Sequence, residues 1–176
     1  NIAEMDADFS HSPKDLVRLV EVLDKNEADV AVGSRYVKGG DVKNWSTYRI
    51  FLSYSASMYV RIITSMPVKD PTAGFVCYKR IVLETIDLSK IRFIGYAFQI
   101  EMKFAAWKLG FTIKEVPITF KDRKLGESKM NKGINMSIFS EAINGVLKMR
   151  WRSFFESYAN NNKENLSLRR SPQSAK

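Results

Sequence analysis

The sequence predicts an α/β domain whose sheet is mostly parallel and is flanked by helices. An apolar segment at 2–5, a helix-forming stretch from residue 12 and a second apolar segment at 29–33 follow one another in the order of a βαβ unit. The chain has 176 residues, enough for one domain with its own core. Of these residues 45% are hydrophobic and 27% are charged, which is the balance of a globular domain.

The first helix is expected to begin at Ser12, a favourable N-cap residue, with Pro13 in its first turn. Leucines at helical spacing continue it to residue 23. The following core elements, in chain order, are a helix over about 48–65, a strand over 74–78, a helix over 98–109 that Gly110 would end, and a strand over 112–120.

The last helix is expected over about 134–158, because apolar residues recur there on one stripe. The segment 121–133 before it is polar, basic and rich in turn residues. Residues 159–176 are polar and have little to bury, so a disordered tail is predicted after a single domain over 1–158.

Composition and charge exclude several classes of protein. Lys and Arg exceed Asp and Glu by nine, and residues 121–176 hold twelve of the former and five of the latter. This bias favours a polyanionic partner such as a nucleic acid, a phosphorylated substrate or an anionic lipid surface, although a solvated basic tail is the alternative. The only cysteine, Cys77, excludes an internal disulfide and a cysteine-built zinc site. No window is long and apolar enough for a membrane-spanning helix.

Two carboxylates, Asp6 and Asp8, follow directly after the first predicted strand. Ligands of open parallel sheets gather at the carboxyl ends of the strands. Two carboxylates one residue apart at such an end can approach one divalent cation, which would in turn bind the phosphates of a nucleotide. The alternative is a capping turn before Ser12.

Cations stand at three further places in the chain. Arg35 follows the second predicted strand and would lie beside the acidic pair, where its planar guanidinium suits a phosphate, and Arg49 begins the next helix. Segment 121–129 combines a glycine, a hydroxyl and several cations, which also suits a phosphate. Surface arginines and a solvated basic loop are the alternatives. His11, the single histidine, is interpreted as a loop residue and not as a base.

Seven segments in this order resemble the dolichol-phosphate (polyprenol-phosphate) mannosyltransferases, which are inverting family-2 glycosyltransferases with a GT-A fold. The segments are Met5–Pro13, Val32–Tyr36, Gly39–Trp45, Asp70–Phe75, Gly95–Met102, Glu115–Phe120 and Asp122–Lys129. The resemblance implies that residues 1–158 are the C-terminal portion of a GT-A catalytic domain. An earlier βαβ portion that reads the base of the nucleotide is expected to be absent, so this chain alone is expected to be inactive.

The resemblance implies an enzyme that transfers mannose from GDP-mannose to a polyprenyl phosphate. A lipid-directed transferase using a UDP-sugar such as UDP-glucose is the alternative within the family, and a nucleic-acid-binding module is the alternative from another class. A divalent cation, Mg²⁺ or Mn²⁺, is expected on Asp6 and Asp8, with Ser10 reaching it through a water.

By the same resemblance, Asp8 and Arg123 are the expected catalytic residues. The nucleotide-sugar residues are Asp6, Ala7, Asp8, Arg35, Arg123 and Lys129, and the acceptor-phosphate residues are Arg35, Arg49, Ser128 and Lys129.

Peripheral contact with the cytoplasmic face of a membrane is expected. A nucleic-acid partner is not expected. The membrane contact would run through the last turns of the 134–158 helix, and a membrane-anchoring partner subunit is a further candidate. The contact residues are Trp151, Phe154, Phe155 and Tyr158, with Lys148, Arg150 and Arg152 facing anionic headgroups. Glu101 is expected to organise part of the site, and a carboxylate on the surface or in the first turn of its helix is the alternative.

Overall fold

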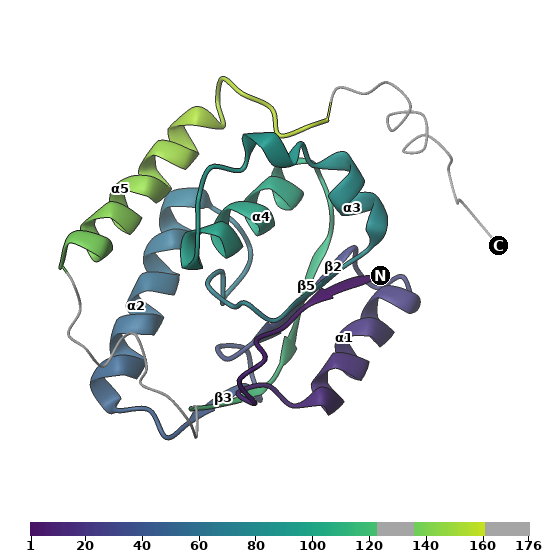
Figure 1. Ribbon diagram of the computed structural model, residues 1–176, viewed down its shortest axis with the longest axis vertical. Coiled ribbons are helices and arrows are strands. Elements are labelled where there is room, and N and C mark those ends of the chain that lie inside the picture. Colours follow the sequence, from purple (N-terminus) through teal and green to yellow (C-terminus); the bar gives the residue numbers. More distant parts are fainter. Residues whose placement is uncertain (123–135, 161–176) are drawn as a thin grey trace.

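The computed structural model describes residues 1–122 and 136–160 (Figure 1). Its main sheet has the order β1-β4-β2-β5 and contains β1 (Ile2–Glu4), β2 (Val30–Ser34), β4 (Val76–Tyr78) and β5 (Ile113–Pro117). A second sheet pairs β3 (Asp41–Lys43) with β6 (Thr119–Lys121). The helices are α1 (Pro13–Asp24), α2 (Thr47–Thr64), α3 (Arg80–Thr85), α4 (Tyr96–Lys108) and α5 (Met136–Arg152), with a short 3-10 helix at Leu88–Lys90.

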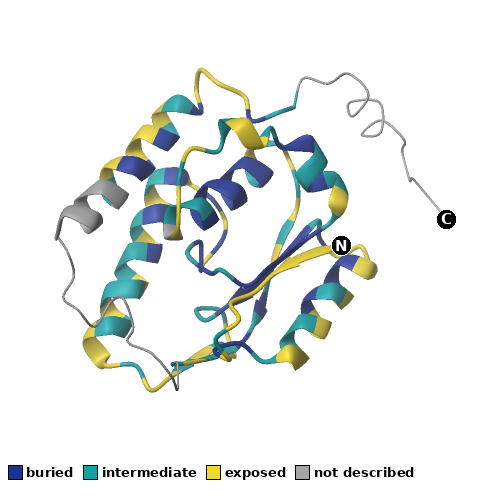
Figure 2. Ribbon diagram, viewed as in Figure 1, coloured by how far each residue is buried: buried dark blue, intermediate teal, exposed yellow. Residues whose placement is uncertain are grey.

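Alternation along the strands sorts their side chains into two cores, because successive residues of a strand point to opposite faces. Val30 and Val32 of β2 belong to a core that α2, α4 and α5 cover, whereas Ala31 belongs to a smaller core under α1. All five residues of β2 are buried, as the dark central strand of Figure 2 shows. The helices therefore form two layers around the sheet, with α1 alone on one face (Figure 1).

The α/β class is confirmed, and the expected strand directions hold for three of the four strands. β2 and β5 are paired in parallel, and β1 and β2 both run antiparallel to β4, which lies between them. The prediction that the sheet is mostly parallel is therefore wrong for the pairing itself. A buried three-residue run such as Val-Cys-Tyr carries no signal for strand direction, which depends on the connections on either side of it.

The expected strand over 112–120 is two strands in two different sheets. β5 follows β2 until β2 ends at Ser34, and the N–H of Ile118 still donates to the carbonyl of Ser34. Beyond this point the chain has lost its first partner, and residues 119–121 pair with β3. Side-chain alternation continues across the change of sheet, so the pattern alone does not reveal it.

The expected helix over 134–158 ends at Arg152, and residues 153–156 form turns. Tyr158 then returns to the core, the residues 86 and 159 form a β-bridge, and the N–H of Asn160 donates to the carbonyl of Thr85. Residues 159 and 160 thus belong to the folded domain rather than to a tail beginning at 159. Residues 161–176 lie outside the described part of the chain.

β1 is an edge strand of the main sheet. It pairs only with β4 among the described residues, and its three residues are all exposed. The acidic segment at 6–8 follows β1 directly. Because β1 and β2 both run antiparallel to β4, their carboxyl ends lie at the same end of the sheet.

Candidate functional site

The loop after β1 turns back on itself and brings two carboxylates to the end of the sheet. One oxygen of Asp8, Oδ1, accepts hydrogen bonds from the backbone N–H of Ser10 at 3.0 Å and from its hydroxyl at 2.5 Å. Phe9 occupies the left-handed region with a φ of 62°. The loop also rests on β6, because the carbonyl of Ser10 accepts from the N–H of Lys121. Asp8 is therefore oriented by its own turn.

His11 lies buried between this loop and the rest of the site. Its ring packs on Phe75 with 4.8 Å between centroids and meets Phe120 edge-on at 5.2 Å, and its Nε2 lies 3.6 Å from Oδ2 of Asp6. Burial lowers the pKa of His11, and the attraction of Asp6 and Asp8 opposes that shift only in part. Because both carboxylates act on one imidazole, the structure places them in the same small region.

Arg35 follows β2 and is paired with the fully buried carboxylate of Asp70. Its Nε donates to Oδ2 at 2.7 Å, one terminal nitrogen donates to Oδ1 at 2.6 Å, and its backbone N–H also donates to Oδ2 at 3.0 Å. Such a bidentate pair fixes both the position and the plane of a guanidinium. Gly40 packs closely against this segment, since a Cβ at that position would lie 2.6 Å from the carbonyl oxygen of Arg35.

Arg49, in the first turn of α2, stacks on the indole of Trp45 with its guanidinium carbon 4.0 Å from the ring centroid. It also forms an ion pair with Asp122 at 3.0 Å. Trp45 meets Phe120 edge-on at 5.4 Å, and Arg35 lies 5.5 Å from the same indole. The two arginines therefore share one aromatic neighbour, and they belong to a single cluster next to the acidic loop.

The predicted site residues are thus partly brought together. Asp6, Asp8 and Arg35 all act electrostatically on His11, and Arg49 joins them through Trp45 and Phe120. Ala7 is exposed between the two carboxylates. The remaining predicted residues, Arg123, Ser128 and Lys129, lie outside the described residues and follow directly after Asp122.

The acidic loop suits a hard divalent cation by its donor set, because carboxylate oxygens are the ligands that Mg²⁺ and Mn²⁺ prefer. Asp6 is largely exposed, and Oδ1 of Asp8 accepts both hydrogen bonds from Ser10. Ser10 is buried and donates to Asp8, which makes it a residue that orients Asp8. Within the described ranges, His, Cys, Asp and Glu do not gather in groups of three or more that could hold a metal.

Several residues of this cluster were missed by sequence reasoning. Asp70, Trp45 and Phe120 lie within the motifs of the resemblance, but the sequence alone assigns no role to their side chains. The available signal was the Asp70-Pro71 pair, because a carboxylate before a proline often begins a turn. That this carboxylate receives Arg35, 35 positions earlier in the chain, depends on the tertiary fold.

Glu101 organises the region where α4 meets the end of α5, and not, as was expected, part of the site at the acidic loop. Its fully buried carboxylate accepts from the backbone N–H groups of Arg92 and Phe93 at 2.8 and 3.0 Å, and it is paired with Arg152. The hydroxyl of Tyr158 also donates to it at 3.2 Å, and burial raises the pKa of that phenol to about 12. Tyr158 and Arg152 therefore face the protein interior, and their expected contact with a membrane is wrong.

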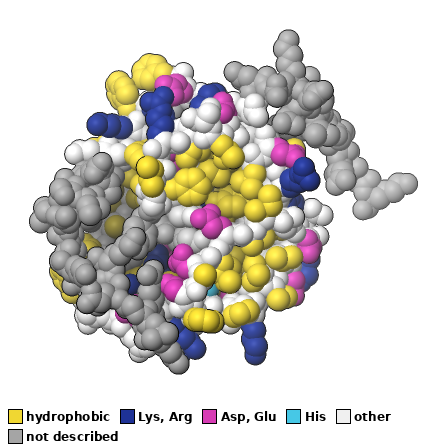
Figure 3. Space-filling model, in the orientation of Figure 1, with side chains coloured by type: hydrophobic (Ala, Val, Ile, Leu, Met, Phe, Trp, Pro, Cys, Tyr) yellow, Lys and Arg dark blue, Asp and Glu magenta, His cyan; other side chains and the backbone are white. Residues whose placement is uncertain are grey.

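Other expected contact residues at the end of α5 do face outward. Trp151, Phe154 and Phe155 are among the most exposed large side chains of the described protein, and Lys148 is exposed beside them. Hydrophobic side chains next to cationic ones are visible at the top of the space-filling view, where α5 ends (Figure 3). In the described part of the chain, no helix is both long and apolar enough to cross a bilayer.

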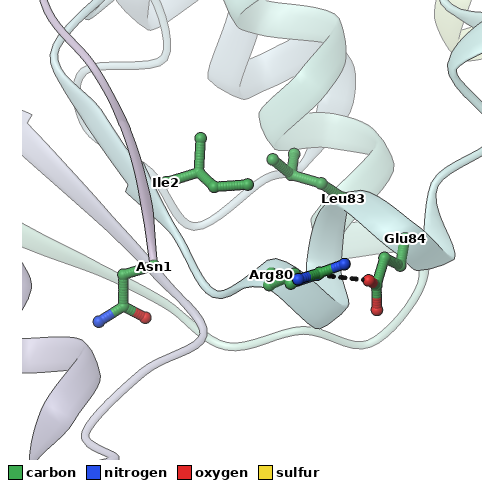
Figure 4. A pocket seen from close by; sticks show the side chains of 5 residues that line it. All are labelled: Asn1, Ile2, Arg80, Leu83 and Glu84. Carbon is green, nitrogen blue, oxygen red and sulfur yellow. Dashed lines mark hydrogen bonds and ion pairs between the residues drawn. The ribbon is translucent and has the colours of Figure 1, made fainter.

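An open hollow elsewhere on the surface is lined by Asn1, Ile2, Arg80, Leu83 and Glu84 (Figure 4). It lies where β1 meets α3, away from the two carboxylates after β1. The polar groups in it are the amide of Asn1 and the exposed ion pair of Arg80 with Glu84. The acidic loop and the arginine–aromatic cluster remain the better candidate site.

Comparison with known proteins shows which family this chain resembles. Residues 2–87, which include Asp6, Asp8, Arg35, Arg49 and Asp70, match the family described as glycosyl transferase family 2. The mixed α/β arrangement with flanking helices is consistent with the GT-A fold of that family.

Three relatives give the comparison more detail. The chain is 47% identical over 146 residues to the polyprenol monophosphomannose synthase of Mycolicibacterium smegmatis, covering 82% of this chain and 55% of that protein. It is 44% identical over 150 residues to the undecaprenyl-phosphate mannosyltransferase of Micrococcus luteus, covering 85% and 61%. The dolichol-phosphate mannosyltransferase of Pyrococcus furiosus is 41% identical over 151 residues, covering 84% and 40%. The chain therefore spans about half the length of these relatives.

Proposed function

Because the chain belongs to glycosyl transferase family 2 over residues 2–87, we propose that the protein moves a mannosyl group from GDP-mannose to a polyprenyl phosphate. The observation that carries this proposal is the cluster of Asp6, Asp8, Arg35 and Arg49 at one end of the sheet, in a chain 41–47% identical to mannosyltransferases of polyprenyl phosphates. The products are polyprenyl-phosphate-mannose and GDP.

The two carboxylates would hold the divalent cation, Mg²⁺ or Mn²⁺. When bound, such a cation neutralises part of the negative charge on the diphosphate that leaves with the nucleotide. The hydrogen bonds from Ser10 fix the orientation of Asp8 before any ligand arrives, so little reorganisation is required of it.

The arginines have the task of bringing two polyanions together. Arg35 is oriented by Asp70, and Arg49 is oriented by the face of Trp45, so both guanidinium groups are held in fixed positions. We assign Arg35, with Arg123 and Lys129, to the donor diphosphate. Arg35 and Arg49, with Ser128 and Lys129, are assigned to the acceptor phosphate. Positioning of this kind supplies much of the rate enhancement in phosphate-linked transfers.

The nucleophile is an oxygen of the acceptor phosphate, which is already anionic at neutral pH. It attacks C1 of the mannose, and the bond from C1 to the diphosphate oxygen breaks on the opposite face, so the configuration inverts. A strong general base is not required. The buried, mainly neutral His11 is consistent with this, because its role in the structure is to pack between the loop and the aromatic rings.

The acceptor is a lipid, so the proposal includes peripheral contact with the cytoplasmic face of a membrane. Exposed apolar side chains support it on two adjacent helices. On α2 they recur along one face and are Tyr48, Phe51, Tyr54, Met58 and Ile62, and α2 contains no acidic residue. On α5 they are Leu147 and Trp151, followed by Phe154 and Phe155. A membrane-anchoring partner subunit would strengthen this contact.

The test uses the full gene product, a short polyprenyl phosphate, Mg²⁺ or Mn²⁺, and labelled GDP-mannose or UDP-glucose in parallel. Labelled lipid from GDP-mannose is expected, and Asp8→Asn is expected to lower the rate at least about a hundredfold. Asp24→Asn is the matched control, because it makes the same change at the exposed end of α1. Label from UDP-glucose alone would change the donor, and absence of label from both would overturn the proposed transfer.

A further inference from the structure

A lysine lies in the interior of the domain, where lysines are rarely found. Lys103 belongs to the middle of α4 and is completely buried. Its Nζ donates to the backbone carbonyl of Ala73 at 2.7 Å and to that of Gln99 at 2.9 Å. The second contact lies within its own helix, so Ala73 is the group that Lys103 joins to α4.

Ala73 is part of the turn at 70–73, which also carries Asp70. The N–H of Ala73 donates to the carbonyl of Asp70, closing the turn. On the β5 side, Glu115 accepts from the N–H groups of Lys69 and Asp70 at 2.8 and 2.9 Å. The turn is therefore bound on one side by a carboxylate of β5 and on the other by the ammonium group of α4.

The carboxylate of Asp70, in this turn, binds mainly Arg35. Asp70 binds Arg35 through three hydrogen bonds, and Thr72 of the same turn accepts a fourth from the guanidinium at 2.9 Å. A displacement of the turn would therefore move Arg35. Small displacements of charged groups have large effects where two anions must be aligned.

We propose that Lys103 is a positioning residue, which fixes the 70–73 turn through the carbonyl of Ala73 and so sets the orientation of Arg35 toward phosphate. Its link to the transfer reaction rests on the proposed function, because that function places a phosphate on Arg35. The structural part, from Lys103 to Arg35, rests on the contacts alone. An apolar residue of similar length would fill the same space without binding the carbonyl.

The charges around Lys103 explain why a cation is tolerated there. It faces Asp70 of the turn, Glu4 of β1 and Glu115 of β5, which attract it, and Arg35 after β2, which repels it. Burial nevertheless dominates and lowers the pKa of Lys103 to about 7. The neutral amine can still donate both hydrogen bonds, so the turn is retained when the proton leaves, but one positive charge is lost from beside the site.

The experiment compares Lys103→Met with Lys108→Met in the full-length protein. The control makes the same substitution on the same helix at an exposed position in its last turn. Two readouts are used, namely hydrogen exchange of the backbone amides and calorimetric binding of inorganic pyrophosphate. Lys103→Met is expected to speed exchange at 69–75 at least tenfold more than in α1, and to weaken pyrophosphate binding about tenfold, while Lys108→Met changes neither.

Lys103→Gln keeps an N–H donor of shorter reach and is expected to give intermediate values; it also serves where the Met variant is too unstable to study. Uniform acceleration of exchange across the domain, or exchange at 69–75 equal to that of the control, would overturn the proposal. Unchanged pyrophosphate affinity with local acceleration would overturn the link to phosphate. Absence of mannosyl transfer by the unaltered protein would overturn the proposed function instead, and the exchange data would still decide the role of Lys103.

Discussion

Two buried carboxylates, Asp70 and Glu101, each bind one arginine. Asp70 binds Arg35 close to the acidic loop, and Glu101 binds Arg152 at the end of α5. The chemistry of the two pairs is the same. Their other partners differ, however, and the difference separates a pair that orients a side chain for binding from a pair that joins parts of the fold.

The Glu101 pair joins four segments of the chain. Its carboxylate also receives two backbone N–H groups of the 91–95 loop and the hydroxyl of Tyr158. By contrast, the hydrogen-bond partners of the Asp70 carboxylate come from Arg35 and from its own turn, and the buried Lys103 binds the same turn. The Asp70 pair therefore orients one guanidinium, and the Glu101 pair holds several segments of the fold together.

The largest effect is expected for the structural pair. Arg152→Met leaves the buried carboxylate of Glu101 without its cation and is expected to lower the free energy of unfolding by about 3–5 kcal/mol. Urea unfolding measures this change. Arg80→Met removes an arginine from an exposed ion pair and should cost less than about 1 kcal/mol. Equal losses in both variants would mean that burial does not distinguish these pairs.

A smaller loss of stability, with a loss of binding, is expected at the other pair. Asp70→Asn keeps the shape of the side chain, but its one amide oxygen can replace only one of the two carboxylate oxygens that accept from Arg35, which should cost about 2–3 kcal/mol. Its affinity for inorganic pyrophosphate should fall about tenfold, whereas that of Arg152→Met should stay unchanged when both are measured by calorimetry below their unfolding temperatures. The reverse order of affinities would break the comparison.

The buried lysine makes stability depend on pH. Because the pKa of Lys103 is lowered to about 7 in the folded protein and is about 10.4 in an unfolded chain, folding releases a proton between these values. The free energy of unfolding should therefore rise with pH from about 7 to 10 by up to about 1.4 kcal/mol per unit, and this dependence should level off below pH 7, where both states carry the proton. Denaturant titrations at pH 7, 8, 9 and 10 measure the slope, and Lys103→Met should lose it. A variant with the slope of the unaltered protein would contradict this assignment.

The smallest effect concerns the strained loop residue. Phe9 is 92% exposed and has a positive φ, a conformation that costs a non-glycine residue roughly 1–2 kcal/mol. Phe9→Gly is expected to raise the free energy of unfolding by about 1 kcal/mol, partly offset by the greater freedom of glycine in the unfolded chain. Asn26→Gly is the control, because asparagine tolerates the left-handed region and should gain less. Thermal unfolding distinguishes the two.

Much of the fold could be predicted from the sequence, because its helices have clear local signals. Each of these signals depends only on residues of the helix that it marks. The structure confirms the start of α1 at Ser12-Pro13, its apolar spacing and the end of α4 before Gly110. The antiparallel β4 and the split strand at 113–121 have no such signal, since both depend on which strand is the neighbour. The short helix α3 was also not predicted.

The site was predictable to a similar degree. Asp6 and Asp8 stand out because they follow a strand, and Arg35 and Arg49 stand out in motifs. Their partners do not, because Asp70 reaches Arg35 across 35 positions and Lys103 reaches Ala73 across 30. At the end of α5 the error had one cause. The sequence suggests that Tyr158 and Arg152 lie at a membrane interface. In the structure both bind the buried carboxylate of Glu101, which comes from a helix 57 and 51 positions earlier in the chain.

The outer edge of β1 decides where the main sheet can grow. A strand that pairs on one side presents a row of backbone donors and acceptors on the other, and in the described part of the chain no strand is paired with that row. A further strand in register with β1 would extend the sheet there and would lie beside the strand that leads into the acidic loop.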